Sequence, residues 1–279
     1  KHILMQQMFS TSPYISIDEQ VQHVNAVSMQ NIHAMKNSLR SHVAAITYSR
    51  DAGADSLDKF VARIQTTTPY EQLTWIPRPV EHNEHVQATP GHASNVFMVG
   101  QTTNIAYDDP KIYALRAAVH ILGGGMSARL MNTIRGKMGL GTYGIYASMQ
   151  RSPNHPCFIV VSGTFAPDAA EAGAEKTIAM ITDWANNGIT QEELDNWKTS
   201  HDGPRAITLD NVQQIVSVHH STNLIGKEPQ EEWDAFEQRV QNVSLEQVNA
   251  LLREHIQPTK LSIVKMGNWM SADDLSDDE

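Results

Sequence analysis

Residues 120–144 have the sequence HILGGGMSARLMNTIRGKMGLGTYG, and this segment is the most informative part of the chain about its structure. Three consecutive glycines at positions 123–125 separate two stretches whose apolar residues recur at helical spacing. Glycine ends helices because it adopts turn conformations at no steric cost and weakens a helix interior. A second glycine-rich turn at residues 139–141 precedes residues 142–149, which have the composition of a strand. The segment therefore predicts a helix, a sharp turn, a second helix and a strand, in that order.

The residues on either side continue a mixed pattern of helices and strands. Asp109 and Pro110 open the first helix, because proline fits the first helical turn. Thr190 and Glu193 form a capping box, and Gly203-Pro204 interrupts the helix that follows it. We expect strands at residues 92–100, 142–149 and 157–164, and helices at about 109–122, 127–137, 167–187, 190–202, 209–224 and 230–255. This order predicts an α+β fold, with a curved, mostly antiparallel sheet and helices packed on one face.

One pattern occurs twice in the chain. Residues 24–35 (VNAVSMQNIHAM) resemble residues 240–251 (VQNVSLEQVNAL). In each copy a serine, Ser28 or Ser244, stands where a helix N-cap belongs, and apolar residues follow at helical spacing. A strand-like run follows each copy, at residues 42–47 and 261–264. The repeat indicates two homologous units, the first of which is represented only by its tail.

The segment at 120–144 resembles the signature of the pitrilysin/insulinase family, the inverted-motif zinc peptidases that include the mitochondrial processing peptidases. The family pattern is a helix that ends in a glycine-rich turn, then Ser-x-Arg-Leu, then an Arg eight residues before a Tyr with Gly-Leu between them. Residues 127–130, Arg135, Gly139-Leu140 and Tyr143 match these elements in order. The order of helices and strands agrees over about residues 90–268, and the resemblance is to the C-terminal, inactive unit of the family.

The resemblance implies a clamshell enzyme built from two similar halves. One half carries H-x-x-E-H, whose histidines bind zinc and whose glutamate is the general base. The other half holds the substrate backbone through an Arg and a Tyr, which correspond to Arg135 and Tyr143. A guanidinium can donate to a peptide carbonyl, and a phenol can donate to a developing oxyanion. From the residues alone, a surface arginine and a half-buried strand tyrosine remain an alternative.

The zinc motif itself is not expected in this chain. Residues 81–85 (EHNEH) come nearest, but Glu81 stands at the first ligand position and the segment is polar, without an apolar helical face. The strand at 157–164, where the third ligand would fall, contains no acidic residue. The other histidines form no convergent set by spacing. We therefore predict no catalytic residue, metal ligand or cofactor in this chain, and zinc in the missing N-terminal half.

Composition excludes several classes of protein. The formal net charge of −10 argues against a nucleic-acid partner, which requires a basic face. No apolar run is long enough to predict a membrane span. The single cysteine, Cys157, lies in the apolar run 157–161, which favours a buried core thiol over a reactive one. The sequence leaves the compartment open, and the bacterial periplasm is only a guess.

These observations predict the following organisation. Residues 1–64 are the C-terminal tail (helix and strand) of an upstream unit, residues 65–91 a linker, residues 92–270 a peptidase-like non-catalytic unit, and residues 271–279 an acidic tail. The predicted function is the substrate-clamping half of a zinc metalloendopeptidase, inactive by itself, with an N-terminal catalytic half and a peptide substrate as partners. The alternative is a structural or assembly subunit built on the same fold. An H-x-x-E-H in the same polypeptide or in a partner would favour the enzyme.

Overall fold

The computed structural model describes residues 1–11, 14–41, 54–62, 74–89, 91–200, 207–208 and 210–269. The chain divides into two compact units. The sheet unit contains residues 1–14, 74–198 and 242–279, and the helical unit contains residues 15–73 and 199–241. The expected strand at 42–47, the break at Gly203-Pro204 and the acidic tail at 271–279 lie outside the described residues.

A five-stranded sheet in the order β1-β5-β2-β4-β3 is the framework of the sheet unit. The strands are β1 (Asn83–Ala88), β2 (Asn95–Thr102), β3 (Gly141–Ser152), β4 (His155–Phe165) and β5 (Ser262–Gly267). β1 and β5 pair in parallel, and the other pairings of these strands are antiparallel. The predicted α+β fold with a mostly antiparallel sheet is confirmed. Residues 83–88, inside the segment expected to be a linker, belong to this sheet.

Strand β4, which lies between β2 and the edge strand β3, is apolar on both faces because both faces are covered. Phe158 and Val160 pack against α1 (His2–Met8), which contacts β2 and β5 as well. Phe165 points to the opposite face, where Gly173 of α6 (Ala170–Asn187) packs directly against its ring. Such two-sided burial explains why this strand has a continuous apolar run rather than an alternating one.

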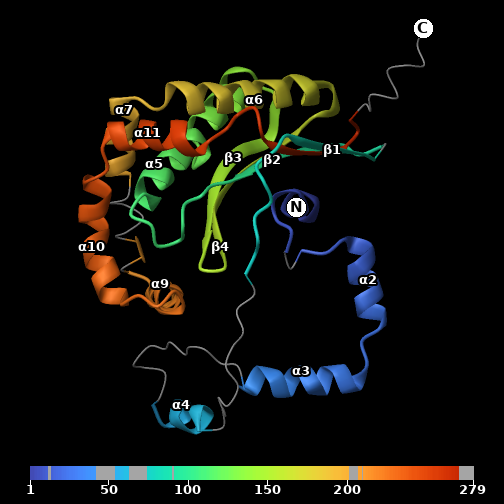
Figure 1. Cartoon of the computed structure of the whole chain (residues 1–279), viewed down its shortest axis with the longest axis vertical. Helices are drawn as coiled ribbons and strands as arrows, with labels where there is room; N and C mark the ends of the chain where they lie inside the picture. Colours follow the sequence, from blue (N-terminus) through green and yellow to red (C-terminus); the bar gives the residue numbers. More distant parts are fainter. Residues whose placement is uncertain are drawn as a thin grey trace. The chain divides into compact units, whose positions relative to one another are not determined.

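Several helices cover the second face of the sheet, as predicted (Figure 1), whereas the cover that α1 gives to the first face was not predicted. α5 (Ile112–Gly123) lies against β3, α6 lies against β4, and α11 (Leu245–His255) packs on both of these helices. Buried Trp184 of α6 donates from its indole nitrogen to the carbonyl of Ala118 in α5, at 3.1 Å. A short 3-10 turn (Pro167–Ala169) precedes α6, and α7 (Gln191–Thr199) follows it.

The helical unit contains α2 (Ile17–Asn25), α3 (Met29–Ser41), α4 (Ala54–Val61), α9 (Val212–Leu224) and α10 (Pro229–Gln241). The prediction of one helix over 230–255 is wrong, because α10 ends at Gln241 and α11 begins at Leu245. Ser244 caps α11: its hydroxyl accepts from the Gln247 amide at 3.1 Å, and the Gln247 side chain accepts from the Ser244 amide at 2.9 Å. Among the described helices, none is both long enough and apolar enough to cross a bilayer.

Candidate functional site

In the first part of the signature segment, residues 123–130, Gly123, Ala128 and Leu130 are buried, whereas Met126 and Ser127 are exposed. α5 ends at Gly123, where a side chain would collide with the backbone nitrogen of Ala147 in β3. Glycine at this position therefore lets the end of α5 approach the sheet edge closely. Leu130, seven positions later, is fully buried and begins the next helical segment. We call residues 123–130 the inner part of the signature.

Arg129, the arginine of the Ser-x-Arg-Leu pattern, has a structural partner. Its Nε and Nη2 donate to the two carboxylate oxygens of Glu193, each at 2.6 Å. Glu193 also accepts from the Thr190 amide at 2.8 Å, which confirms the predicted capping box. Hydrogen bonding to Glu193 raises the pKa of the Arg129 guanidinium. Burial alone would raise the pKa of Glu193, but the bonds from Arg129 and Thr190 outweigh it and lower the pKa of this carboxyl.

The second part of the signature begins in a π-helix, η2 (Met131–Lys137). The amide of Met138 donates to the carbonyl of Thr133, five residues earlier, at 3.0 Å. Ile134 on one side of η2 is buried, whereas Arg135 and Lys137 on the other side are exposed. Wide helical turns of this kind are frequent at functional sites. The chain then turns through Gly139, whose φ of 66° favours glycine, into β3.

The structure brings the two predicted substrate-binding residues together. Arg135 Nη1 donates to the backbone carbonyl oxygen of Tyr143 at 2.9 Å. The Tyr143 side chain is 77% exposed, so its phenol projects into solvent. One guanidinium nitrogen thus anchors the arginine to β3, and its other N–H groups have no partner among the described residues. Residues 135–143 are called the outer part of the signature.

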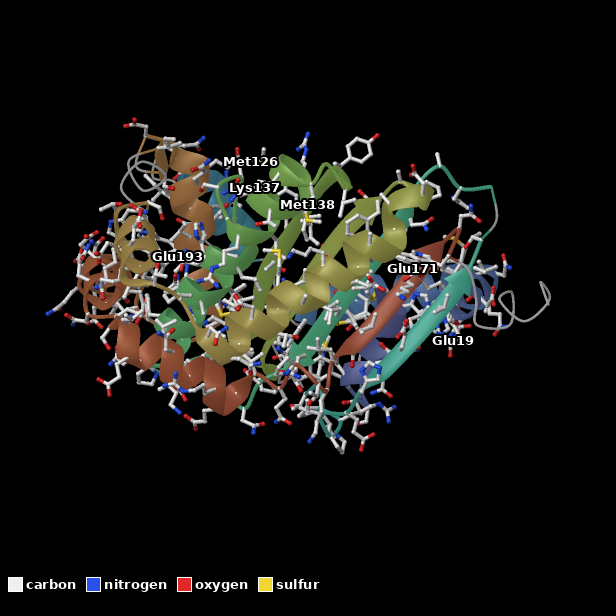
Figure 2. All side chains as sticks on the ribbon, turned by 90° about the horizontal axis from the view of Figure 1, so that it is seen from above. Glu19, Met126, Lys137, Met138, Glu171 and Glu193 are labelled. Carbon is white, nitrogen blue, oxygen red and sulfur yellow. The ribbon has the colours of Figure 1, made fainter. Side chains whose placement is uncertain are left out.

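Tyr143 is one of four exposed apolar side chains in this part of the sequence, which we call the patch. It consists of Met126, Met138, Tyr143 and Tyr146. The Tyr146 hydroxyl lies 3.9 Å from the Met126 sulfur, and Figure 2 shows Met126, Lys137 and Met138 at one edge of the molecule. Methionine adapts its shape to different apolar partners, and Arg135 and Lys137 add positive charge in an acidic chain. The patch can therefore contact a peptide of mixed sequence.

The two tyrosines of the patch, Tyr143 and Tyr146, lie on an edge strand. β3 is last in the sheet order, so one side of its main chain pairs with β4 and no described strand pairs with the other. Its register with β4 shifts between Gly141 and Ile145, around the position of Tyr143. An edge strand presents unpaired N–H and C=O groups to an extended segment of another chain.

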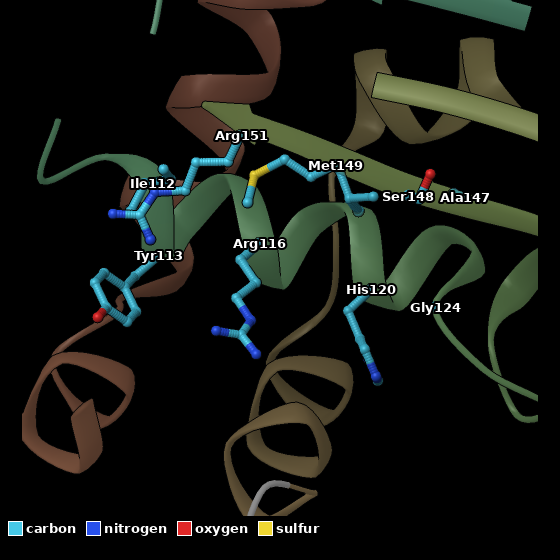
Figure 3. Close-up of a pocket in the computed structure, with 10 residues that line it drawn as sticks. Ile112, Tyr113, Arg116, His120, Gly124, Ala147, Ser148, Met149 and Arg151 are labelled. Atoms are coloured by element: carbon cyan, nitrogen blue, oxygen red, sulfur yellow. The ribbon is translucent and has the colours of Figure 1, made fainter. Parts of the chain in front are cut away.

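A cavity of about 340 Å³ between α5 and β3 was not anticipated from the sequence (Figure 3). Its lining includes Arg116 and His120 of α5 and Arg151 of β3. Desolvation lowers the pKa of Arg116, which stays protonated at neutral pH because an arginine titrates so far above it. One feature of the sequence could have indicated a polar site here: Arg116 and His120 are one helical turn apart on the polar face of the predicted helix.

The described residues contain no group of three or more His, Cys, Asp or Glu side chains placed to hold a metal ion. In the EHNEH segment, Glu84 pairs instead with Lys265 of β5 at 3.1 Å. Lys265 also reaches Glu171 of α6, at 3.3 Å. The described residues therefore do not fit a zinc site of the H-x-x-E-H kind.

Cys157 is buried in β4, as predicted. Desolvation raises the pKa of its thiol to about 11, so the reactive thiolate is scarce at neutral pH. Its carbonyl accepts a hydrogen bond from the Thr103 hydroxyl at 2.7 Å. The residue is part of the core rather than of a nucleophilic site.

Known proteins of one family resemble this chain in sequence. The family described as "Peptidase M16 inactive domain" matches residues 48–200. A curated relative, the uncharacterized zinc protease YmxG of Bacillus subtilis, is 28% identical over 147 residues, which cover 52% of this chain and 34% of that protein. This chain therefore spans about a third of the length of YmxG.

Solved structures show the same fold. A peptidase M16 inactive domain from Pseudomonas fluorescens superposes with a TM-score of 0.76 at 22% identity, covering 97% of this chain and 65% of that one. The ferredoxin protease FusC, in complex with Arabidopsis ferredoxin, gives a TM-score of 0.66 at 17% identity and covers 96% of this chain but 30% of its own. Because the family match spans more than half of the sequence, the chain belongs to the peptidase M16 family, as an inactive unit of the pitrilysin/insulinase type.

Proposed function

We propose that this chain is the non-catalytic half of a zinc metalloendopeptidase and holds the peptide substrate for a partner half that carries H-x-x-E-H. The observation that carries the proposal is the placement of Arg135 and Tyr143. Both lie at the solvent-facing end of η2 and β3, and a hydrogen bond of 2.9 Å links them. A unit that served only as a scaffold would not require this pair at an exposed edge.

The proposed roles follow from the chemistry of each group. Arg135 is held by one nitrogen on the Tyr143 carbonyl, and its remaining N–H groups would donate to a carbonyl of the substrate backbone. The Tyr143 phenol would donate to the oxygen that gains charge as the peptide bond is attacked. Neither residue acts as a nucleophile or a general base, so the chain alone would not hydrolyse peptides.

Substrate binding would use the free edge of β3. An extended peptide that pairs with this edge gains main-chain hydrogen bonds that do not depend on its sequence. The methionine and tyrosine side chains of the patch would contact its apolar residues, and Lys137 would favour an acidic one. Such a surface suits unfolded or flexible peptides rather than a folded protein face.

Zinc would be bound by the partner half, because the described residues of this chain present no suitable ligands. The name of the relative YmxG, a zinc protease, supports a zinc enzyme. The partial coverage of the relatives supports a partner half, since the known chains extend well beyond the part that this one matches. The partner half would lie in the same polypeptide or in a second subunit.

Reconstitution tests the proposal. Peptidase activity and zinc content are measured for this chain, for the H-x-x-E-H half, and for the two combined, with unfolded peptides as substrate. We expect no hydrolysis by this chain alone, and hydrolysis with one zinc per assembly after combination. Zinc-dependent hydrolysis by this chain alone would refute the proposal, and so would an inactive assembly that contains zinc.

A further inference from the structure

The cavity between α5 and β3 has a basic lining in an acidic chain. Arg116 and His120 of α5 and Arg151 of β3 line it, and all three side chains are accessible to solvent. None of the described residues that line the cavity is an aspartate or a glutamate. The whole chain carries a formal net charge of −10, so the lining is opposite in sign to the molecule. Such a cavity attracts a negatively charged ligand.

The local structure holds these side chains together. Arg116 and His120 are four residues apart, so they lie on the same side of α5 (Figure 3). A side chain at position 124 would collide with the His120 ring, so Gly124 leaves the space that this ring occupies. Arg151 Nε donates to the backbone carbonyl of Tyr107, which fixes the guanidinium near the end of β3. A helix and a strand therefore position the two arginines independently of each other.

The two guanidinium groups interact unfavourably with each other. Desolvation lowers the pKa of Arg116 most, and the positive charge of Arg151 lowers it further. Arg151 makes no other hydrogen bond to the described residues, so its terminal N–H groups can donate to a ligand. A carboxylate accepts two parallel hydrogen bonds from one guanidinium, and its charge would offset the repulsion between the two arginines.

The cavity also lies against the edge strand. Ala147, Ser148 and Met149 of β3 line it, and its volume of about 340 Å³ is sufficient for an acidic side chain. Arg151 follows Tyr143 by about eight residues, which is roughly 26 Å along an extended strand. A peptide that pairs with β3 beside Tyr143 would therefore reach the cavity about eight residues further along its own chain.

We infer that this cavity binds a carboxylate of the substrate peptide through Arg116 and Arg151. The inference rests on the proposed function, because it takes the occupant of the β3 edge to be an extended peptide. The carboxylate can belong to an aspartate or glutamate side chain or to the C-terminus of the peptide. Pairing between main chains does not depend on sequence, so the cavity would supply a preference for peptides with a negative charge at one end.

Titration calorimetry of this chain with three synthetic peptides tests the inference. Each peptide is about ten residues long, so that it can span β3 from Tyr143 to Arg151, and each is acetylated at its N-terminus. The first carries a glutamate and a C-terminal amide, the second a glutamine and a free C-terminal carboxylate, and the third a glutamine and an amide. We expect the first or the second to bind at least about tenfold more tightly than the third, and the tighter one identifies the source of the carboxylate.

A double variant shows whether the cavity is responsible. Arg116→Gln with Arg151→Gln should lower the affinity for the preferred peptide to that for the uncharged one, and leave the affinity for the uncharged peptide unchanged. Lys59→Gln with Arg253→Gln removes the same charge at exposed cations of α4 and α11 that are not among the residues lining the cavity. This control should keep the preference. Circular dichroism checks that both variants keep the helical content of the wild type.

The outcomes separate this inference from the proposed function. Loss of the preference in the cavity variant alone supports the carboxylate site, even when a reconstituted peptidase hydrolyses nothing. Equal binding of the three peptides by the wild type overturns the site and leaves peptide pairing at β3 in place. A preference that the cavity variant retains also overturns it, because the carboxylate is then bound elsewhere. Absence of binding by all three peptides overturns the site and counts against the proposed function as well.

Discussion

The inner and outer parts of the signature segment are close in sequence and different in what their side chains contact. Arg129 in the inner part is half-buried and makes two 2.6 Å bonds to Glu193, 64 residues away. Arg135 in the outer part is exposed and bonds a backbone carbonyl only eight residues away. One sequence signature therefore combines a residue that stabilises the fold, Arg129, with a residue that is exposed to a ligand, Arg135. Variants in the inner part should therefore lower the free energy of unfolding, and variants in the outer part should lower activity.

The largest loss is expected from Leu130→Ala in the inner part. Leu130 is fully buried, and truncation of such a leucine costs about 2–5 kcal/mol because it removes apolar contacts and leaves a cavity. Met138→Ala in the outer part removes a similar volume at an exposed position and should change stability by less than about 0.5 kcal/mol. Urea denaturation measures both. Equal losses would contradict the division into inner and outer parts.

A smaller loss is expected from Gly123→Ala. The added methyl group would meet the backbone of Ala147, so α5 or β3 must shift, and such overpacking costs about 1–3 kcal/mol. Gly125→Ala is the control, because a methyl group there meets no atom within 4 Å. Thermal unfolding of the two variants compares the positions. A tolerated alanine at 123 would show that α5 does not approach β3 as closely as described.

The next effect is that of Glu193→Gln, which removes the charge that Arg129 binds. Hydrogen bonds to charged groups contribute about 1.5–3 kcal/mol, and the partial exposure of this pair places the expected loss near the lower end of that range. Because the folded pKa of Glu193 is lowered, its contribution is present above the ordinary value of 4.5 and is lost as the pH falls through the folded pKa.

Urea denaturation between neutral and acidic pH measures whether the stabilisation by Glu193 is lost as the pH falls. The wild type should lose stability relative to Glu193→Gln as the pH falls below about 4.5, until the two curves approach each other. Glu192→Gln, at the exposed neighbouring position, serves as the control and should follow the wild type. A constant difference between wild type and Glu193→Gln at all pH values would show that the ion pair contributes nothing.

The smallest effect on stability is expected from Arg135→Ala and Tyr143→Phe. Both side chains are exposed, and surface substitutions away from buried features usually change stability by less than about 0.5 kcal/mol. The hydrogen bond from Arg135 to the Tyr143 carbonyl joins exposed groups, so in Arg135→Ala a water molecule can donate to this carbonyl instead. Thermal unfolding of the two variants measures the effect. A loss as large as that of Leu130→Ala would show that the outer part holds the fold.

Local patterns in the sequence were sufficient to predict many of the helices and strands. Capping boxes depend on residues three positions apart, and those of Thr190 with Glu193 and of Ser244 with Gln247 are confirmed. The Ser244 signal should also have limited the predicted helix over 230–255, since a serine cap favours a helix start over a helix interior. The strands around residues 92–100, 142–149 and 157–164 were recognisable from apolar runs and turns.

Features that depend on distant partners were not predictable from these signals. β1 pairs with β5 across more than 170 residues of chain, and its own side chains are mostly exposed, so its sequence has no apolar run. The cavity near Arg116 depends on how α5 lies against β3. The bond between Arg129 and Glu193 joins elements separated in sequence. The assignment of residues 1–64 to an upstream unit and the roles of Arg135 and Tyr143 stay predictions.

Steady-state kinetics of the reconstituted peptidase test the central claim most directly. We expect Tyr143→Phe to lower kcat/KM about 100-fold, the scale observed when a donor to a developing oxyanion is removed. Arg135→Ala should lower it at least about tenfold, because a hydrogen bond from a charged donor contributes about 1.5–3 kcal/mol. Arg253→Ala, at an exposed cation of α11 outside the patch, is the control and should lower it less than about threefold, as expected for a screened surface charge. Zinc content and unfolding temperature should stay those of the wild type in all three variants. Full activity in both Arg135→Ala and Tyr143→Phe would contradict the account.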